Sequence, residues 1–135
     1  MEKLLELMRL DEPDNQGIVY PTAVVAKAIA EFEDRIKSTN GVMGECNPPS
    51  TNSSTGVDPR HGTIDLSRVS HIVQHIWIEK KILKCKVKLL GHYAQIENIM
   101  NLEFEGVPRA IGVLEGHKVC TDYTLITVDL SLMEI

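Results

Sequence analysis

The sequence has no hydrophobic run that could cross a membrane. A membrane-spanning helix needs about 20 consecutive apolar residues, and the apolar runs within these 135 residues are far shorter. Residues 1–7 carry acidic side chains inside their apolar run, which is not the pattern of a secretory signal. We therefore expect no membrane association.

Cysteine is scarce, and the three that occur, Cys46, Cys85 and Cys120, are widely spaced. An odd number of cysteines at such spacings forms neither a disulfide framework nor a paired metal-binding motif. We therefore expect no metal and no cofactor. Such cysteine usage is typical of a reducing cytoplasm, or of a particle assembled in one.

Basic residues are also in the minority, with 14 Lys and Arg against 19 Asp and Glu and a net charge of −5. This balance argues against a broad nucleic-acid-binding surface, and we expect no direct binding of nucleic acid. Hydrophobic residues make up 43% of the chain and charged residues 24%, as in ordinary globular proteins. The length predicts one domain over residues 1–135.

The first forty residues predict a short element, a loop and a helix. Residues 1–10 fit a strand, a helical turn or a flexible arm, and residues 11–17 are turn formers. Pro21 suits the first turn of a helix, and Asn40 with Gly41 suits its end. Apolar residues recur between them at helical spacing and predict a face that covers a sheet: Val25, Ala28, Ile29, Phe32 and Ile36.

From residue 63 the pattern changes to period two. Residues 69–78 carry bulky apolar groups on both faces, which predicts a central strand covered on both sides. Residues 83–89 alternate more cleanly and predict a lysine face, turned to solvent or to an acidic partner: Lys84, Lys86 and Lys88.

The last third of the chain predicts one helix and two strands. Residues 94–105 have a helical stripe that ends at Phe104, and residues 107–114 and 125–132 have strand patterns. In the last strand we expect Thr127 and Asp129 to face outward. Strands interrupted by helices predict an α+β domain with an antiparallel, β-barrel-like sheet and flanking helices.

Residues that could perform chemistry are dispersed. The loop of residues 46–62 holds Ser50, Ser53 and Ser54, with no evident base beside them. In the strand of residues 69–78, His71 and His75 share a face by alternation, so their rings could be neighbours.

A metal or base role for this histidine pair is less favoured than a hydrogen-bonded structural role, because a zinc site needs further ligands and only Cys85 is a conceivable one. Adjacent strand residues point to opposite faces, so we expect Ser70 not to meet His71 easily.

Four segments together resemble the prohead maturation serine proteases of tailed phages. They are residues 15–21 before the first helix, the segment Gly44-Glu45-Cys46-Asn47-Pro48-Pro49, the strand of residues 67–77, and residues 106–112. The second is similar to the Gly-Glu-x-x-His-Pro signature of that family, and the fourth to the segment that carries its nucleophile. The resemblance runs from about residue 11 to residue 129 and implies a fold like that of herpesvirus and phage capsid-maturation proteases.

The same resemblance places Pro48 where the family has its histidine base, or Asn47 if the alignment slips by one. The serine nucleophile falls at Pro108 or at its neighbour Val107, whereas Gly44, Glu45 and Arg109 match their motifs. Proline has no titratable or nucleophilic group, so the resemblance implies a protease scaffold without its Ser–His chemistry.

We therefore expect a non-proteolytic structural protein of a phage head, such as a cement, decoration or minor capsid protein. Its expected partners are phage capsid proteins or further copies of itself, in an oligomer within a virion assembled in the host cytoplasm. Two alternatives stay open. The chain could be an active maturation protease with a displaced triad, with His61 or His71 as base and a loop serine or Ser67 as nucleophile. It could also be a regulatory partner of an active protease.

Overall fold

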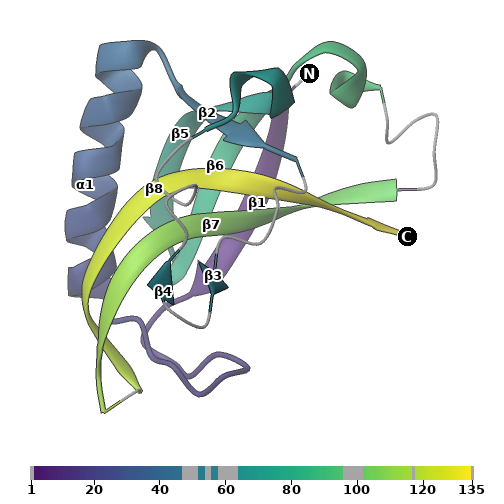
Figure 1. Ribbon diagram of the computed structural model, residues 1–135. Coiled ribbons are helices and arrows are strands. Elements are labelled where there is room, and N and C mark those ends of the chain that lie inside the picture. The colour runs from purple at the N-terminus through teal and green to yellow at the C-terminus, as the bar shows by residue number, and fades with distance from the viewer. Residues whose placement is uncertain are drawn as a thin grey trace.

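The fold is known from a computed structural model, which describes residues 2–46, 52–53, 56–57, 64–95, 102–116 and 118–134. A four-stranded antiparallel sheet, a long β-hairpin and one α-helix enclose a single hydrophobic core (Figure 1). The α+β class predicted from the sequence is therefore confirmed. None of the helices in this part of the chain combines the length and the apolar character that crossing a membrane requires.

The four-stranded sheet has the order β1-β6-β5-β2, with every neighbouring pair antiparallel. Its strands are β1 (Glu2–Arg9), β2 (Val42–Glu45), β5 (Val69–Glu79) and β6 (Ile82–Leu89). Residues 1–10, which the sequence left open, thus form a strand. Lys80 and Lys81 both have positive φ, which suits the two-residue turn between β5 and β6. The lysine face of β6 points away from the core, as its alternation predicted.

The second layer is a hairpin of β7 (Leu102–Glu115) and β8 (Val119–Glu134), which crosses over the sheet (Figure 1). The helix predicted for residues 94–105 is wrong at both ends, because the 3-10 turn η3 (Gly91–Ala94) includes its first residue and β7 begins at Leu102. Residues 96–101 lie outside the described residues. Phe104, assigned to the buried stripe of that helix, is buried in β7 and pairs with Leu132 of β8. A short apolar pattern cannot distinguish the two kinds of element, and the hairpin contacts decide between them.

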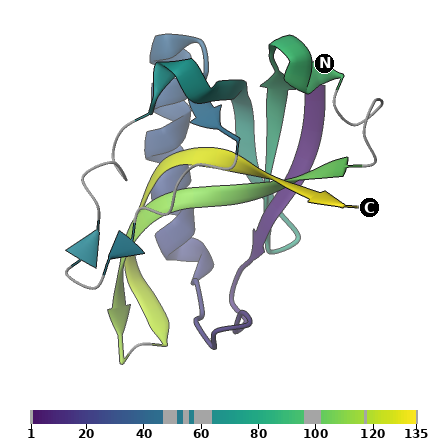
Figure 2. The same cartoon turned by 45° about the vertical axis from the view of Figure 1, so that its right-hand side comes forward.

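The single α-helix, α1 (Thr22–Thr39), packs beside β5 and β8 at one side of the two layers (Figure 2). Four of its five predicted apolar residues are buried, and Ile36 is partly buried against the core. The Asp11 carboxylate accepts hydrogen bonds from the backbone N–H and the hydroxyl of Thr22, at 2.8 and 2.6 Å. Asn40 ends the helix in the left-handed conformation, as its position after the apolar stripe predicted.

The sheet and the hairpin approach each other on two sides without forming a closed barrel. On one side, Cys46 after β2 forms a single parallel bridge with Leu130 of β8. On the other side, Gly106 of β7 lies against Leu5 and Leu7 of β1, but no ladder joins these strands in the described part of the chain. The predicted barrel-like sheet is thus an open one.

The contact between β2 and β8 buries residues that the sequence pattern placed on the solvent side. Thr127 and Asp129 are 0% and 3% exposed, so the prediction that they face solvent is wrong. The Thr127 hydroxyl donates to the Met43 carbonyl at 2.7 Å, which ties β8 to β2. Polar residues on a strand normally face water, but here β2 and an arginine of β7 cover them.

Within the long loop predicted for residues 46–62, the structure describes Cys46 and two short strands. Asn52–Ser53 (β3) and Gly56–Val57 (β4) pair antiparallel in a small two-stranded sheet. The 3-10 turn η2 (Leu66–Arg68) then leads into β5, and the Asp65 carboxylate caps it by accepting from the N–H of Ser67 at 3.0 Å.

Candidate functional site

Three charged side chains from three strands meet where the hairpin passes closest to β2. Arg109 of β7 donates two hydrogen bonds to the Asp129 carboxylate of β8, from Nε at 2.7 Å and from Nη2 at 2.9 Å. Its Nη2 also donates to Glu45 Oε2 of β2 at 3.0 Å. We call these three residues the charge cluster.

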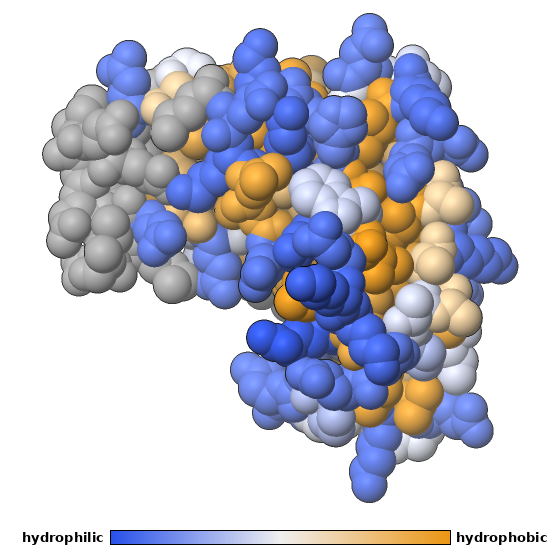
Figure 3. Space-filling model, turned by 180° about the vertical axis from the view of Figure 1, so that it is seen from behind, coloured by the Kyte–Doolittle hydropathy of each residue, from blue (hydrophilic) through white to orange (hydrophobic). Residues whose placement is uncertain are grey.

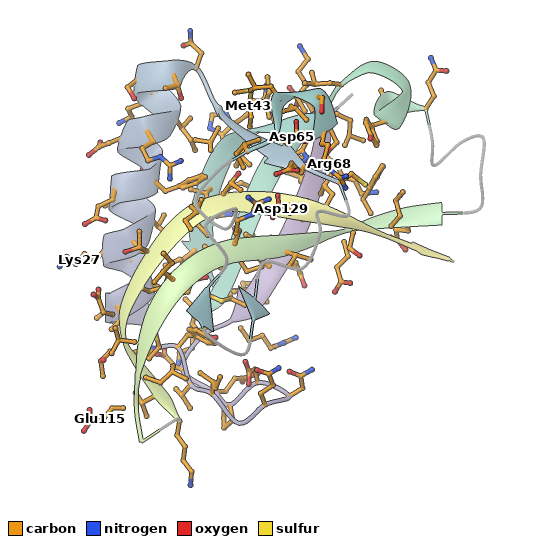
Figure 4. The ribbon with its side chains drawn as sticks, viewed as in Figure 1. Lys27, Met43, Asp65, Arg68, Glu115 and Asp129 are labelled. Carbon is orange, nitrogen blue, oxygen red and sulfur yellow. The ribbon has the colours of Figure 1, made fainter. Side chains whose placement is uncertain are left out.

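Arg68 of η2 extends the charge cluster toward the surface, with its Nε 3.5 Å from Glu45 Oε1. Figure 4 shows Asp65, Arg68 and Asp129 in one region, where β8 passes β2 and η2. The backbone N–H of Glu45 also donates to Asp129 Oδ1 at 3.1 Å. Two carboxylates therefore balance two guanidinium groups.

The charge cluster is almost fully withdrawn from water. Glu45, Arg109 and Asp129 are 0%, 4% and 3% exposed. Burial by itself would lower the pKa of Arg109, but its hydrogen bonds to Asp129 and Glu45 outweigh that effect and raise the pKa. The arginine is thus held as a cation between two acids, which links β2, β7 and β8.

A serine–histidine pair lies beside the charge cluster on β5. Ser70 Oγ is 2.7 Å from His71 Nδ1, and His71 Nε2 is 2.6 Å from the Val128 carbonyl. The carbonyl can only accept, so Nε2 carries the proton and Nδ1 accepts from the serine hydroxyl. The expectation that Ser70 would not meet His71 is therefore wrong.

Two β-bulges explain why simple alternation failed along β5. Gly44 pairs with His71 and Glu45 with Val69, so Ser70 is an extra residue on its strand. Such a bulge disrupts the alternation of side chains and lets consecutive residues turn to one side.

The second bulge falls at Gln74, between the pairs of Val73 with Val87 and of His75 with Lys86. It separates the two histidines that alternation would place together. His71 is fully buried, whereas His75 is exposed, so the predicted shared face of these residues is wrong.

The serine–histidine pair is withdrawn from the surface of the protein. Ser70 and His71 are both 0% exposed, and each ring nitrogen of His71 is already engaged. Burial lowers the pKa of His71, with a partial opposing effect from the Val128 carbonyl and Asp129. The pair therefore forms a neutral, hydrogen-bonded link between β5 and β8.

Gly44 makes this close packing possible. A Cβ atom at this position would lie 2.3 Å from both His71 Nε2 and the Val128 carbonyl oxygen. Real Cβ atoms do not approach that closely, so β2 can pass the histidine only with glycine there. The adjacent motif residues Gly44 and Glu45 thus have separate roles, one in close approach and the other in the charge cluster.

Pro108, where the resemblance places the nucleophile, lies next to Arg109 on β7 and pairs with Val128. It borders an open groove of about 790 Å³ between β7 and the loop before α1. The described residues that line this groove include no serine, threonine, cysteine or histidine. Val107, the alternative position, is 43% exposed on the same strand.

Most of the other residues considered from the sequence are not part of the described structure. Pro48, Asn47, His61, Ser50 and Ser54 lie outside the described residues. Ser67 Oγ donates to Asp65 Oδ1 at 2.7 Å, a local turn contact.

Cys85 is fully buried, and burial raises the pKa of its thiol to about 12. Within the described part of the chain, no three His, Cys, Asp or Glu side chains are grouped as a metal site would require.

The sequence motifs singled out Glu45 and Arg109 but missed Asp129, Arg68 and the Ser70–His71 contact. An acid at residue 129 amid the apolar residues of the last strand was a usable signal, because a buried acid needs a cationic partner. The bulge at Ser70 left no local signal, since it depends on how β2 pairs with β5.

Comparison with known proteins gives an informative match among solved structures. No family model matches the chain, and no curated protein matches it. Among solved structures, the chain is similar to the bacteriophage T4 capsid assembly protease, gp21, with a TM-score of 0.70 and 16% sequence identity. The match covers 96% of this chain and 80% of the T4 protein. It shows a shared fold, in agreement with the fold expected from the motif resemblance.

Proposed function

We propose that this chain is a non-proteolytic protein of a tailed-phage head, built on the fold of a capsid assembly protease. The observation that carries the proposal is the residue content around Arg109. Its neighbour Pro108 has no hydroxyl, and the charge of Arg109 is paired with Glu45 and Asp129. His71, whose Nε2 contacts the Val128 carbonyl, is buried. The fold shared with the T4 protease supports a place in capsid assembly.

The missing hydroxyl matters because acyl transfer needs a nucleophile and a base together. Loss of a single member of a Ser–His–acid triad lowers turnover by roughly four to six orders of magnitude. A proline at the nucleophile position provides no oxygen for an acyl-enzyme, and a second proline at residue 48 provides no imidazole to activate one. Binding is the function that such a scaffold can retain.

The proposed role is therefore contact with capsid proteins or with further copies of this chain. A cement, decoration or minor capsid protein would be present in many copies within the virion. Mass spectrometry of purified virions tests this role directly. The protein should be found in mature particles at a copy number comparable to that of other head components, and its absence from them would contradict the role.

Co-expression with the major capsid and scaffold proteins of the same phage tests the absence of proteolysis. Those proteins should keep their intact masses. An active capsid assembly protease expressed with its own substrates provides the positive control. Gel filtration of the same mixtures also shows whether the chain co-elutes with an active protease, which is the outcome expected of a regulatory partner.

An active protease with a displaced triad is the second candidate, and the contact between Ser70 Oγ and His71 Nδ1 at 2.7 Å is the observation that favours it. Both side chains are fully buried, however, so a peptide carbonyl cannot reach the serine without opening β2. If cleavage products do form, the variants His71→Gln and His61→Ala identify which histidine acts as the base.

A further inference from the structure

The turn end of the β7–β8 hairpin leaves three apolar side chains partly exposed. Val113, Leu114 and Val119 are 56%, 36% and 39% exposed. Figures 1 and 2 show this end projecting from the body of the molecule. Together with Glu115, these residues form what we call the tip. Apolar groups gathered on a projection of this kind mark a contact surface.

A groove of about 520 Å³ lies on the opposite face, between the second half of α1 and the outer side of β5 and β6. Its apolar lining includes Ile36, Ile76 and Trp77, and Lys37 and Lys86 also line it. We call it the rear groove. Figure 3, which views this face, shows an apolar strip that runs between the helix side and the sheet.

The floor of the rear groove contains an unsatisfied polar atom. Gln74 is the extra residue of the second bulge in β5, and its Oε1 is buried without a hydrogen-bond partner among the described residues. A buried carbonyl oxygen of this kind is unfavourable unless a donor reaches it. A shift of the Gln74 side chain on docking would let a backbone N–H of an incoming turn provide that donor.

Glu115 of the tip is opposite in sign to Lys37 of the rear groove, and Lys118, in the same turn as Glu115, is opposite in sign to Glu33 of the groove. Lys37, in the last turn of α1, has no ion-pair partner among the described residues, and the same is true of the Glu115 carboxylate at the tip. Figure 4 shows Glu115 at the end of the hairpin, directed away from the body. Lys86 is already paired with Glu2, and Glu33 and His75 also line the groove.

We propose that the tip of one copy docks in the rear groove of the next copy. Val113 and Leu114 would cover the apolar strip of the groove, and Glu115 would face Lys37. The tip and the last turn of α1 lie toward opposite ends of the molecule (Figure 1), so a chain cannot fill its own groove. Contacts of this head-to-tail type build closed rings or open filaments. The proposal does not depend on whether the chain cleaves proteins.

Sedimentation velocity over a wide range of protein concentration tests the proposal. The wild-type chain should self-associate, and Leu114→Asp should weaken association about tenfold or more, because a desolvated apolar contact becomes a buried charge. Glu115→Lys and Lys37→Glu should each weaken it about fivefold, and the chain that carries both should recover. Glu103→Lys, the same charge change at the far end of β7, is the matched control and should have no effect.

Mixing two variants tests the direction of the contact. Leu114→Asp chains have an intact groove, and Trp77→Ala chains have an intact tip, so their mixture should form dimers and nothing larger. Circular dichroism checks that each variant folds, and Lys37→Glu replaces Trp77→Ala if the latter does not. A wild-type chain that stays monomeric at every concentration, or self-association that Leu114→Asp leaves unchanged, would overturn the proposal.

Discussion

At the scale of single residues, Arg109 joins the two layers of the fold. Its guanidinium group contacts acids from β2 and β8 at once, in an environment almost free of water. A buried charge that loses its partner is strongly destabilising, even where the intact pair itself adds little net stability. Removal of Arg109 would therefore leave the buried carboxylates of Glu45 and Asp129 without its positive charge.

Replacement of Arg109 by methionine should lower the free energy of unfolding by about 3–5 kcal/mol, because Asp129 would remain buried without a cation and Glu45 would keep only the partly exposed Arg68. Urea denaturation measures the loss. Arg9→Met is the matched control, since Arg9 forms a 3.9 Å surface pair with Glu12 and such pairs contribute about 0–1 kcal/mol. Equal effects of the two substitutions would contradict the assignment.

The buried imidazole of His71 gives a pH dependence with a definite sign. Its pKa in the folded chain lies below the ordinary value of 6.5, mainly because of burial. As the pH falls below 6.5, the unfolded chain takes up the proton first, so the free energy of unfolding decreases until the folded-state pKa is reached.

Denaturation series at several pH values should show this loss in the wild-type chain and a smaller one in His71→Gln. A single group contributes at most about 1.4 kcal/mol per pH unit. NMR titration of the ring should also show a neutral His71 at pH values where an exposed histidine is already charged. An imidazole of His71 that titrates at or above its ordinary pKa would contradict the buried, neutral assignment.

At the scale of elements, the sequence predicted those features that depend on local spacing. Periodicity and turn residues predict the apolar face of α1 and its end at Asn40. They also predict the β5–β6 hairpin and the lysine face of β6. The predictions fail where pairing with a strand distant in the sequence decides which element forms or which face is buried. β7 replaces a predicted helix because Phe104 pairs across the hairpin, and two bulges reverse the expected faces along β5.

The candidate site shows the same division. Glu45 and Arg109 were found because they belong to short motifs, whereas Asp129 was placed on the wrong face of its strand. Its burial results from β2 lying over β8, and alternation within one strand contains no information about that contact. Charged residues in an apolar strand are best interpreted together with possible partners elsewhere in the chain.

The approach of β2 to β5 and β8 depends on Gly44. Substitution by alanine would place a methyl group 2.3 Å from Val128 O and His71 Nε2, so β2 must shift outward. Overpacking of this kind costs about 1–3 kcal/mol, which thermal or urea unfolding would detect. Met43→Ala, on the exposed neighbour in β2, is the control and should change stability by less than about 0.5 kcal/mol. A Gly44→Ala chain of wild-type stability would show that β2 lies farther from His71.

At the scale of the whole molecule, the chain has a fold similar to that of the T4 capsid assembly protease. The Arg109 guanidinium group is paired with Glu45 and Asp129, and the contact between Ser70 and His71 is buried beneath β2. Among the described residues, the surfaces that stay open include the groove beside Pro108, the rear groove and the tip. These are surfaces on which the proposed contacts within a phage head would form.

The most direct test of this account is the intact mass of the capsid and scaffold proteins after co-expression with this chain. The account predicts that their masses stay unchanged, and that they are equally unchanged with the His71→Gln variant. Defined cleavage products that appear with the wild-type chain and vanish with His71→Gln or His61→Ala would contradict it.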